Sequence, residues 1–167
     1  SVSKIVFRDT GKTKEHKDKS KKVMSDATAY MISSVLQDVS MTGGKPHNIA
    51  AKTGTTNYDE ATMRNNHMPS DAIRDSWVVG YTTKTVIGMW YGYDYIDKNG
   101  EYVLRNIPAT IQKDKLFLAL ARGVMKNDND DFKMPDSVVK LGIITGSNPP
   151  QVAEDGYGGS ITYEYFK

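Results

Sequence analysis

The chain of 167 residues contains no cysteine. This absence excludes a disulfide framework, thiolate catalysis and any zinc site built on cysteine. The sequence also has no signal-peptide pattern at its beginning and no run of about 18 apolar residues that could span a bilayer. With 38% apolar and 25% charged residues, the composition is that of a folded globular domain with a sizeable core.

Several common catalytic motifs are missing as well. The histidines His16, His47 and His67 are far apart in the sequence and form no HExxH motif. No GxSxG elbow of the α/β-hydrolase type occurs. The string Gly11–Thr13 reads GKT, but Val6 stands where a Walker A loop needs its first glycine. These absences predict that the chain binds neither a metal nor a cofactor.

The net charge of +2 is unevenly distributed. Residues 11–22 hold six lysines against Glu15 and Asp18. We interpret this segment as a solvated hairpin loop; the alternative is a patch that binds an anionic polymer or lipid. No aromatic residues are interleaved with the lysines, so stacking on nucleic-acid bases has no support and we expect no nucleic-acid partner.

Two segments have the periodicity of amphipathic helices. Residues 25–41 predict a helix capped by Ser25, and residues 110–126 predict a second helix capped by Thr110. The apolar residues expected to share a face of the first helix are Met31, Ile32, Val35, Leu36 and Val39. Those of the second helix are Leu116, Phe117, Leu120, Ala121 and Val124.

The remaining apolar runs predict strands. Residues 47–56, 76–83, 85–94 and 137–145 are rich in β-branched and aromatic residues, and a short turn joins the second run to the third. Strands joined by short turns pair antiparallel, so we expect an α+β fold with an antiparallel sheet flanked by helices. The polar stretch 57–75 shows no clear period and is expected to be a loop.

The run AAKTGTTNYD contains the most suggestive chemistry, at Lys52, Thr53, Gly54 and Thr55. If it forms a strand lining a groove, a peptide can add to it as a further strand, and Gly54 permits close approach. Thr53 and Thr55 are two residues apart, so both hydroxyls face one side of the strand and can reach one carboxylate. Lys52 adds a positive charge. The alternative is an exposed strand end before a polar loop.

Neighbouring segments give this short motif a context. VMSDATAYMISSVLQDV precedes AAKTGTTN, and the runs SWVVGYT and IGMWYGYD follow it, before the exit at Met134–Asp136. In this order they resemble the C-terminal half of the transpeptidase domain of class A (bifunctional) penicillin-binding proteins. That family has a hairpin of the form D-x-W-x-V-G-Y-T and G-V-W-x-G-Y-D after its third motif, K-T/S-G. The resemblance covers most of residues 1–140 and implies a β-lactamase/transpeptidase-like fold.

The resemblance implies a serine-type D-Ala-D-Ala transpeptidase. A serine followed three residues later by lysine attacks the D-Ala-D-Ala end of a peptidoglycan stem peptide, and β-lactams acylate the same serine. Lys52 and the hydroxyls of Thr53 and Thr55 would bind the terminal carboxylate. The Thr55 backbone N–H would be half of the oxyanion hole, where loss of one donor costs about 3–4 kcal/mol of barrier stabilisation.

Two parts of that machinery are not apparent in the sequence. Ser1–Lys4 reads SVSK and matches S-x-x-K by count, but it has a strand-like sequence at the wrong place, and no Ser-x-Asn occurs. We therefore interpret residues 1–167 as the C-terminal portion of a single transpeptidase domain. Its partner would be the N-terminal half, which carries both motifs. The resemblance also places the intact, membrane-anchored protein at the extracytoplasmic face of the bacterial cell membrane.

Two other interpretations stay open. The chain could be a non-catalytic module that binds peptidoglycan without cross-linking it, or a polyanion-binding module that uses the lysines of residues 12–22. A cut domain is expected to expose a large apolar face of its sheet. The stretch 57–75 is expected to lie beside the mouth of the groove, where it could gate access.

Overall fold

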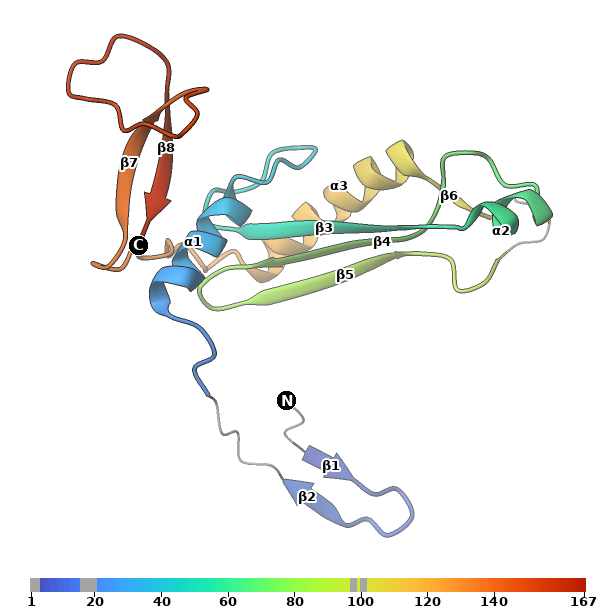
Figure 1. Cartoon of the computed structure of the whole chain (residues 1–167). Coiled ribbons are helices and arrows are strands. Elements are labelled where there is room, and N and C mark those ends of the chain that lie inside the picture. The colour runs from blue at the N-terminus through green and yellow to red at the C-terminus, as the bar shows by residue number, and fades with distance from the viewer. Residues whose placement is uncertain (1–3, 16–20, 97–98, 100–101) are drawn as a thin grey trace.

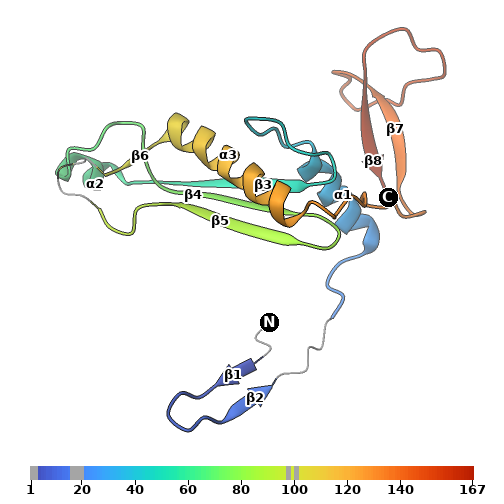
Figure 2. The same ribbon diagram turned by 180° about the vertical axis from the view of Figure 1, so that it is seen from behind.

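The computed structural model describes residues 4–15, 21–96, 99 and 102–167. Its main body is an antiparallel sheet with one helix along one face and another helix at one end (Figures 1 and 2). This arrangement confirms the expected α+β fold with an antiparallel sheet flanked by helices. The three long strands, in their order across the sheet, are β3 (Ala50–Asn57), β4 (Ala72–Tyr81) and β5 (Val86–Gly92).

The other elements are arranged around this sheet. The helices are α1 (Asp26–Gln37), α2 (Glu60–Asn65) and α3 (Asn106–Val124). Strand β6 (Leu104–Arg105) pairs with β4. Two hairpins, β1 (Lys4–Val6) with β2 (Thr13–Glu15) and β7 (Val139–Ile144) with β8 (Ile161–Phe166), lie outside the main sheet (Figure 1). Within the described ranges no helix is both long and apolar enough to cross a membrane.

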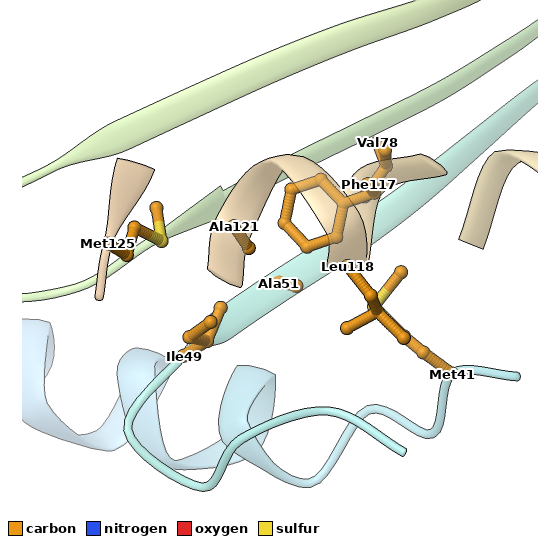
Figure 3. Packing of buried hydrophobic residues seen from close by; sticks show 8 residues of the cluster. All are labelled: Met41, Ile49, Ala51, Val78, Phe117, Leu118, Ala121 and Met125. Atoms are coloured by element: carbon orange, nitrogen blue, oxygen red, sulfur yellow. The ribbon is translucent and has the colours of Figure 1, made fainter. Parts of the chain in front are cut away.

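The sheet buries one face and leaves much of the other open. Alternate residues of β4 point toward α3, where Val78 and Gly80 are buried and the ring of Phe117 fills the space over Gly80. Figure 3 shows this core between the helix and the strands. On the opposite face, Trp77 and Val79 are 47% and 46% exposed. The expected exposure of an apolar sheet face is therefore present in the described residues.

The predicted helices form, but only one of the two predicted caps is correct. Ser25 caps α1, and its side chain accepts a hydrogen bond from the N–H of Thr28 at 3.2 Å. Helix α3 begins at Asn106, four residues before the predicted cap Thr110, and Arg105 stands at its N-cap without a side-chain hydrogen bond. The earlier start follows directly from β6, which brings the chain back to β4 just before the helix.

The predicted apolar face of α1 is only partly buried. Ile32 and Val35 are 46% and 67% exposed, and Met31, Leu36 and Val39 are half-buried. The fully buried residues of the helix are Ala27, Ser33 and Ser34. The Ser33 hydroxyl lies 3.0 Å from the Tyr81 hydroxyl on the open side of β4. Small residues allow α1 to approach the end of the sheet, and Ile32 and Val35 face outward.

The predicted apolar face of α3 divides into two. Phe117 and Ala121 are buried against the sheet as expected, but Leu116, Leu120 and Val124 are exposed. The two groups lie on adjacent stripes of the helix, and the flat sheet covers only one of them. Periodicity alone assigns both stripes to one broad face.

Four described elements were absent from the sequence-based assignment. They are β2, α2, β6 and β8. The expectation of a loop over 57–75 was wrong where α2 forms and also over 72–75, where β4 has already begun. The sequence feature that could have predicted α2 is Asp59, a typical N-cap residue followed three positions later by Thr62. The Asp59 carboxylate accepts hydrogen bonds from the Thr62 N–H at 2.9 Å and from the Thr62 hydroxyl at 2.6 Å.

A buried hydrogen bond ties the hairpin end of the sheet to the segment after α3. The Thr82 hydroxyl donates to Asp128 Oδ2 at 2.8 Å, and both residues are buried. Hydrogen bonds from Thr85 and Thr82 hold the pKa of Asp128 below its ordinary value. A carboxyl whose pKa is lowered on folding stabilises the protein above its unfolded-state pKa and loses that contribution as the pH falls.

Thr82→Val should therefore lower the midpoint of thermal unfolding of the chain by a few degrees at neutral pH. The difference from the unsubstituted chain should shrink as the pH falls below the ordinary range of aspartate, because protonated Asp128 no longer favours the folded state. Thr83→Val is the matched control, since Thr83 is exposed in the same turn. Equal loss of stability in both variants, or a pH-independent loss, would contradict the prediction.

Candidate active site

The K-T-G-T motif lies on strand β3 at the edge of the sheet. Strand β3 pairs antiparallel with β4 in unbroken register from Ala50↔Tyr81 to Thr56↔Asp75. On its other side no strand among the described residues pairs with it. One full row of β3 backbone groups is thus available to an added strand, as expected for a groove wall.

The turn between β4 and β5 determines which backbone groups of β4 point toward β3. The Thr82 N–H donates to the Thr85 carbonyl at 2.9 Å and closes the hairpin. Hydrogen-bonded and non-hydrogen-bonded pairs alternate in an antiparallel ladder, and β4 and β5 keep register from Tyr81 to Asp75. Residues of β4 that lie an even number of positions before Thr82 therefore bond to β5. Trp77 lies an odd number of positions before Thr82, so its backbone groups bond toward β3.

The same alternation assigns the groups of β3. Gly54 is the register partner of Trp77, so its N–H and carbonyl bond to β4. The backbone groups of Thr53 and Thr55, on either side of it, then point to the free edge. The Thr55 N–H is directed away from the sheet, which is the orientation that an oxyanion donor requires.

The side chains of the motif divide between the two faces of the sheet. Thr53 and Thr55 lie opposite Val78 and Ser76, which point toward α3, so both threonine side chains share that face. The expected alternation of the threonines is therefore present. Lys52 and Gly54 belong to the opposite, open face together with Val79 and Trp77.

Lys52 is exposed and its ammonium returns to the strand edge. Its Nζ donates to the Thr53 carbonyl oxygen at 2.9 Å. This carbonyl is one of the groups that point away from β4, so the lysine charge lies at the edge where an added peptide would hydrogen-bond. The Lys52 side chain leaves the strand on the face opposite to the side chains of Thr53 and Thr55. Its ammonium nevertheless lies at the same edge as the outward backbone groups of Thr53 and Thr55.

Packing within the chain does not explain the glycine of the motif. A Cβ at Gly54 would meet only the Cβ of Trp77, at 3.7 Å, an ordinary van der Waals contact. At Gly80 on the neighbouring strand, a Cβ would clash with the Phe117 ring, with Cε2 at 3.2 Å and Cε1 at 3.3 Å. A Cβ at Gly80 would force the Phe117 ring to shift, whereas Gly54 leaves space on the side open to solvent.

A buried charge behind the motif was not singled out from the sequence. Lys113 of α3 is 1% exposed, and its Nζ lies 3.7 Å from Asp114 Oδ1. Burial lowers the pKa of Lys113 most, Asp114 raises it in part, and the nearby charge of Lys52 lowers it further. The sequence feature that could have predicted the burial of Lys113 is its position four residues before Phe117, in the stripe of α3 that contacts the sheet.

Of the SVSK string, only Lys4 is among the described residues. Ser1 and Ser3 lie outside the described residues, and Lys4 belongs to the β1–β2 hairpin, which lies apart from β3 (Figures 1 and 2). His47 contacts Asp131 at 3.0 Å on an exposed surface. In the part of the chain that the structure describes, no group of three or more His, Asp or Glu side chains is arranged to hold a metal ion.

Comparison with known proteins identifies the family. The family described as penicillin binding protein transpeptidase domain matches residues 1–106. Penicillin-binding protein 1A/1B of Bacillus subtilis is 34% identical over 160 residues, which cover 91% of this chain. The chain belongs to the penicillin-binding protein transpeptidase family. This confirms the resemblance found in the sequence.

Other members of the penicillin-binding protein family match shorter parts. Penicillin-binding protein 1F of Bacillus subtilis is 34% identical over 147 residues, and penicillin-binding protein 1A of Streptococcus oralis is 34% identical over 99 residues. These matches cover 84% and 55% of this chain. The chain spans only 17%, 19% and 15% of the lengths of the three relatives, in the order given.

The two strand glycines provide a test of this geometry. Gly80→Ala should destabilise the chain by about 1–3 kcal/mol, because the new methyl group overpacks against Phe117. Gly54→Ala should change the free energy of unfolding by no more than about 0.5 kcal/mol, as is usual for a substitution with room. Chemical denaturation of both variants measures this difference. A large loss of stability in Gly54→Ala would show that the fold itself needs the glycine.

Proposed function

We propose that this chain is the substrate-binding portion of a peptidoglycan DD-transpeptidase, which cross-links stem peptides through an acyl-enzyme and is acylated by β-lactams. The observation that carries the proposal is the free edge of β3. There Thr53 and Thr55 direct backbone groups outward, Lys52 places its charge, and Gly54 leaves room for an approaching chain. Membership of the penicillin-binding protein family supports the same assignment.

The stem peptide adds to β3 as a further antiparallel strand. The outward carbonyl and N–H groups of Thr53 and Thr55 pair with its backbone, and the missing Cβ at Gly54 allows it to approach. The scissile D-Ala-D-Ala carbonyl then lies at the Thr55 N–H. As the tetrahedral intermediate forms, its oxyanion accepts a hydrogen bond from this N–H, which is preoriented by the ladder and needs no reorganisation.

The terminal carboxylate of the donor peptide is bound by the side chains of the motif. The hydroxyls of Thr53 and Thr55 point to one face of the strand and donate to the carboxylate, and the ammonium of Lys52 supplies an opposite charge near the edge. A β-lactam presents its own carboxylate in the same place. Leaving-group expulsion frees D-alanine, and the amine of a second stem peptide resolves the acyl-enzyme.

The attacking serine is supplied by a companion segment, the N-terminal half of the same transpeptidase domain, which carries the S-x-x-K and S-x-N motifs. Two apolar surfaces support this arrangement. Trp77 and Val79 are half exposed on the open face of the sheet, and Ile32 and Val35 point outward from α1. These exposed apolar residues are where the companion segment would pack.

We further propose that residues 1–167 form the C-terminal portion of a single domain. The chain spans less than a fifth of each relative described above, so the remainder of a comparable protein is long enough to supply the companion half. The intact protein would act at the extracytoplasmic face of the bacterial cell membrane, where peptidoglycan is cross-linked, and would be held there by an anchor outside this segment.

Labelled penicillin tests the proposal. The full-length protein that carries this segment should form a stable one-to-one acyl adduct on a serine outside residues 1–167, and the 167-residue chain by itself should form none. Mass spectrometry of tryptic peptides locates the adduct. An adduct on Ser1 or Ser3 would contradict the proposal that the attacking serine lies outside this chain. A full-length protein that binds peptidoglycan but is never acylated would identify a non-catalytic binding module instead.

Gly54→Ala in the full-length protein links the strand edge to catalysis. The added methyl group keeps the substrate from seating against β3, so the second-order rate of acylation by penicillin should fall by about a hundredfold, the cost expected of a misplacement near 1 Å. The unfolding midpoint should stay near that of the unsubstituted protein. An unchanged acylation rate would contradict the close-approach role of Gly54.

A further inference from the structure

The hairpin of β4 and β5 contains a cross-strand contact that the mechanism above does not use. The indole N–H of Trp90 donates to Asp75 Oδ1 at 2.9 Å. The Trp90 ring also fills the space beside Gly92, where a Cβ would lie only 2.7 Å from Trp90 Cε2. Because Asp75 and Gly92 are register partners, the indole crosses from β5 to β4 over a position without a side chain. The three residues Asp75, Trp90 and Gly92 are called the clasp below.

The clasp lies on the open face of the sheet. Asp75 is two residues before Trp77, whose side chain is exposed on that face, and Trp90 is the register partner of Trp77. Asp75 and Trp90 are themselves half-buried. Neither belongs to the clusters of described core residues that pack under α3. Packing of the core therefore does not account for the contact.

The clasp lies in the last row in which all three long strands pair. This row consists of Thr56, Asp75 and Gly92. One step further along β3 the register shifts, because Asn57 pairs with Ile73 and leaves one residue of β4 without a partner on β3. An extra residue of this kind is a β-bulge. The clasp thus marks the boundary between the regular ladder and the bulge.

The extra residue of the bulge is Arg74, and the clasp contacts it as well. Arg74 Nε lies 3.9 Å from Asp75 Oδ2, whereas Trp90 binds the other oxygen of the same carboxylate. One carboxylate therefore links the bulge to the neighbouring strand. The Arg74 side chain is 63% exposed, so the ion pair is weak and the hydrogen bond to Trp90 is the stronger tie.

The place of the bulge decides the direction of the Thr55 backbone. Asp75 and Trp77 belong to the alternate residues of β4 whose backbone groups bond toward β3. Their register partners Thr56 and Gly54 bond to β4, so Thr55 between them points outward. If the bulge moved two residues toward the motif, Thr55 would become the partner of Asp75, and its N–H would turn into the ladder.

The first step of such a movement passes through Asp75. When the bulge moves by one residue, Asp75 becomes the extra residue in place of Arg74. The extra residue of a bulge departs from regular strand conformation, and the direction of its side chain changes with it. The hydrogen bond to Trp90 ties the Asp75 side chain to β5 in the regular row, so this step has to break the clasp.

We propose that Asp75 and Trp90 are positioning residues for the oxyanion donor of the transpeptidase site. The inference rests on the proposed function and adds a control on the register of its motif strand. The clasp keeps the bulge beyond Thr56, and the Thr55 N–H therefore stays directed to the free edge of β3. Asp75 and Trp90 do not touch the substrate; they act through the ladder.

Acylation of the full-length protein by a penicillin tests the inference through two measurements. The second-order acylation rate should fall by about tenfold in Asp75→Ala and in Trp90→Phe. This is less than the roughly hundredfold cost of losing an oxyanion donor outright, because the Thr55 N–H is misdirected in only part of the molecules. The infrared carbonyl band of the acyl-enzyme, assigned with an isotope label, should gain a component at higher wavenumber, since a carbonyl without its hydrogen-bond donor is less polarised.

Further variants separate the clasp from general stability. Asp75→Asn keeps an oxygen that accepts from the indole and should leave the rate and the band near those of the unsubstituted protein. The double variant Asp75→Ala/Trp90→Phe should lose no more than either single variant, because each substitution removes the same contact. Trp90→Phe keeps a ring beside Gly92 and serves alone where Asp75→Ala does not fold.

The matched control is Tyr91→Phe. It removes the hydrogen bond from the Tyr91 hydroxyl to Gln112 Oε1, 2.5 Å long, at the neighbouring residue of β5 but on the face that α3 covers. This variant should change neither the acylation rate nor the carbonyl band. A change as large as that in Trp90→Phe would overturn the inference.

The remaining outcomes are distinguishable. If the unsubstituted protein is acylated and Asp75→Ala and Trp90→Phe change neither measurement, the positioning role is wrong and the proposed function stands. If the rate falls while the carbonyl band stays in place, the clasp acts only on stability and the inference is overturned. An equal loss in Asp75→Asn and Asp75→Ala would also overturn it. If the unsubstituted full-length protein is not acylated, the proposed function fails and the positioning role fails with it.

Discussion

The site depends on the alternation of hydrogen bonds in one antiparallel ladder. The bond from the Thr82 N–H to the Thr85 carbonyl sets the phase of the β4–β5 hairpin, and the unbroken register carries that phase to β3. A shift of one residue would turn the backbone groups of Thr53 and Thr55 inward and send their side chains to the other face. The position of a turn far away in the sequence thus decides which backbone groups of β3 lie on its free edge.

Helix α3 makes this phase stable, because it buries only one of the two faces. Val78 and Gly80 face the helix, and the Phe117 ring packs against Gly80, where a Cβ would force the ring to shift. The other register would expose this set and bury Trp77 and Val79 in their place. Hydrophobic burial on one face therefore fixes the chemistry of the strand edge, although none of the core residues belongs to the K-T-G-T motif.

The sequence was sufficient for the motif strand and for the hairpin that follows it, because short turns and period-two patterns are local signals. It was insufficient for the helix faces. In α1 the apolar residues Ile32 and Val35 point outward, and in α3 two apolar stripes compete for one sheet. Which stripe is buried depends on the partner surface, and no pattern within the helix contains that information. The burial of Lys113 was not predicted for the same reason, since a lysine in a helix is normally solvated.

The open and covered surfaces follow from an unequal division of the sheet. The face covered by α3 is closed, and the residues of the main core lie there. The opposite face, with Trp77 half exposed beside Gly54, is open and gives an approaching segment both apolar area and a clear path to the motif. A fully closed domain would lose this access. Strand β3 lies at the boundary between the two environments, and its ladder with β4 fixes the directions of its backbone groups during folding.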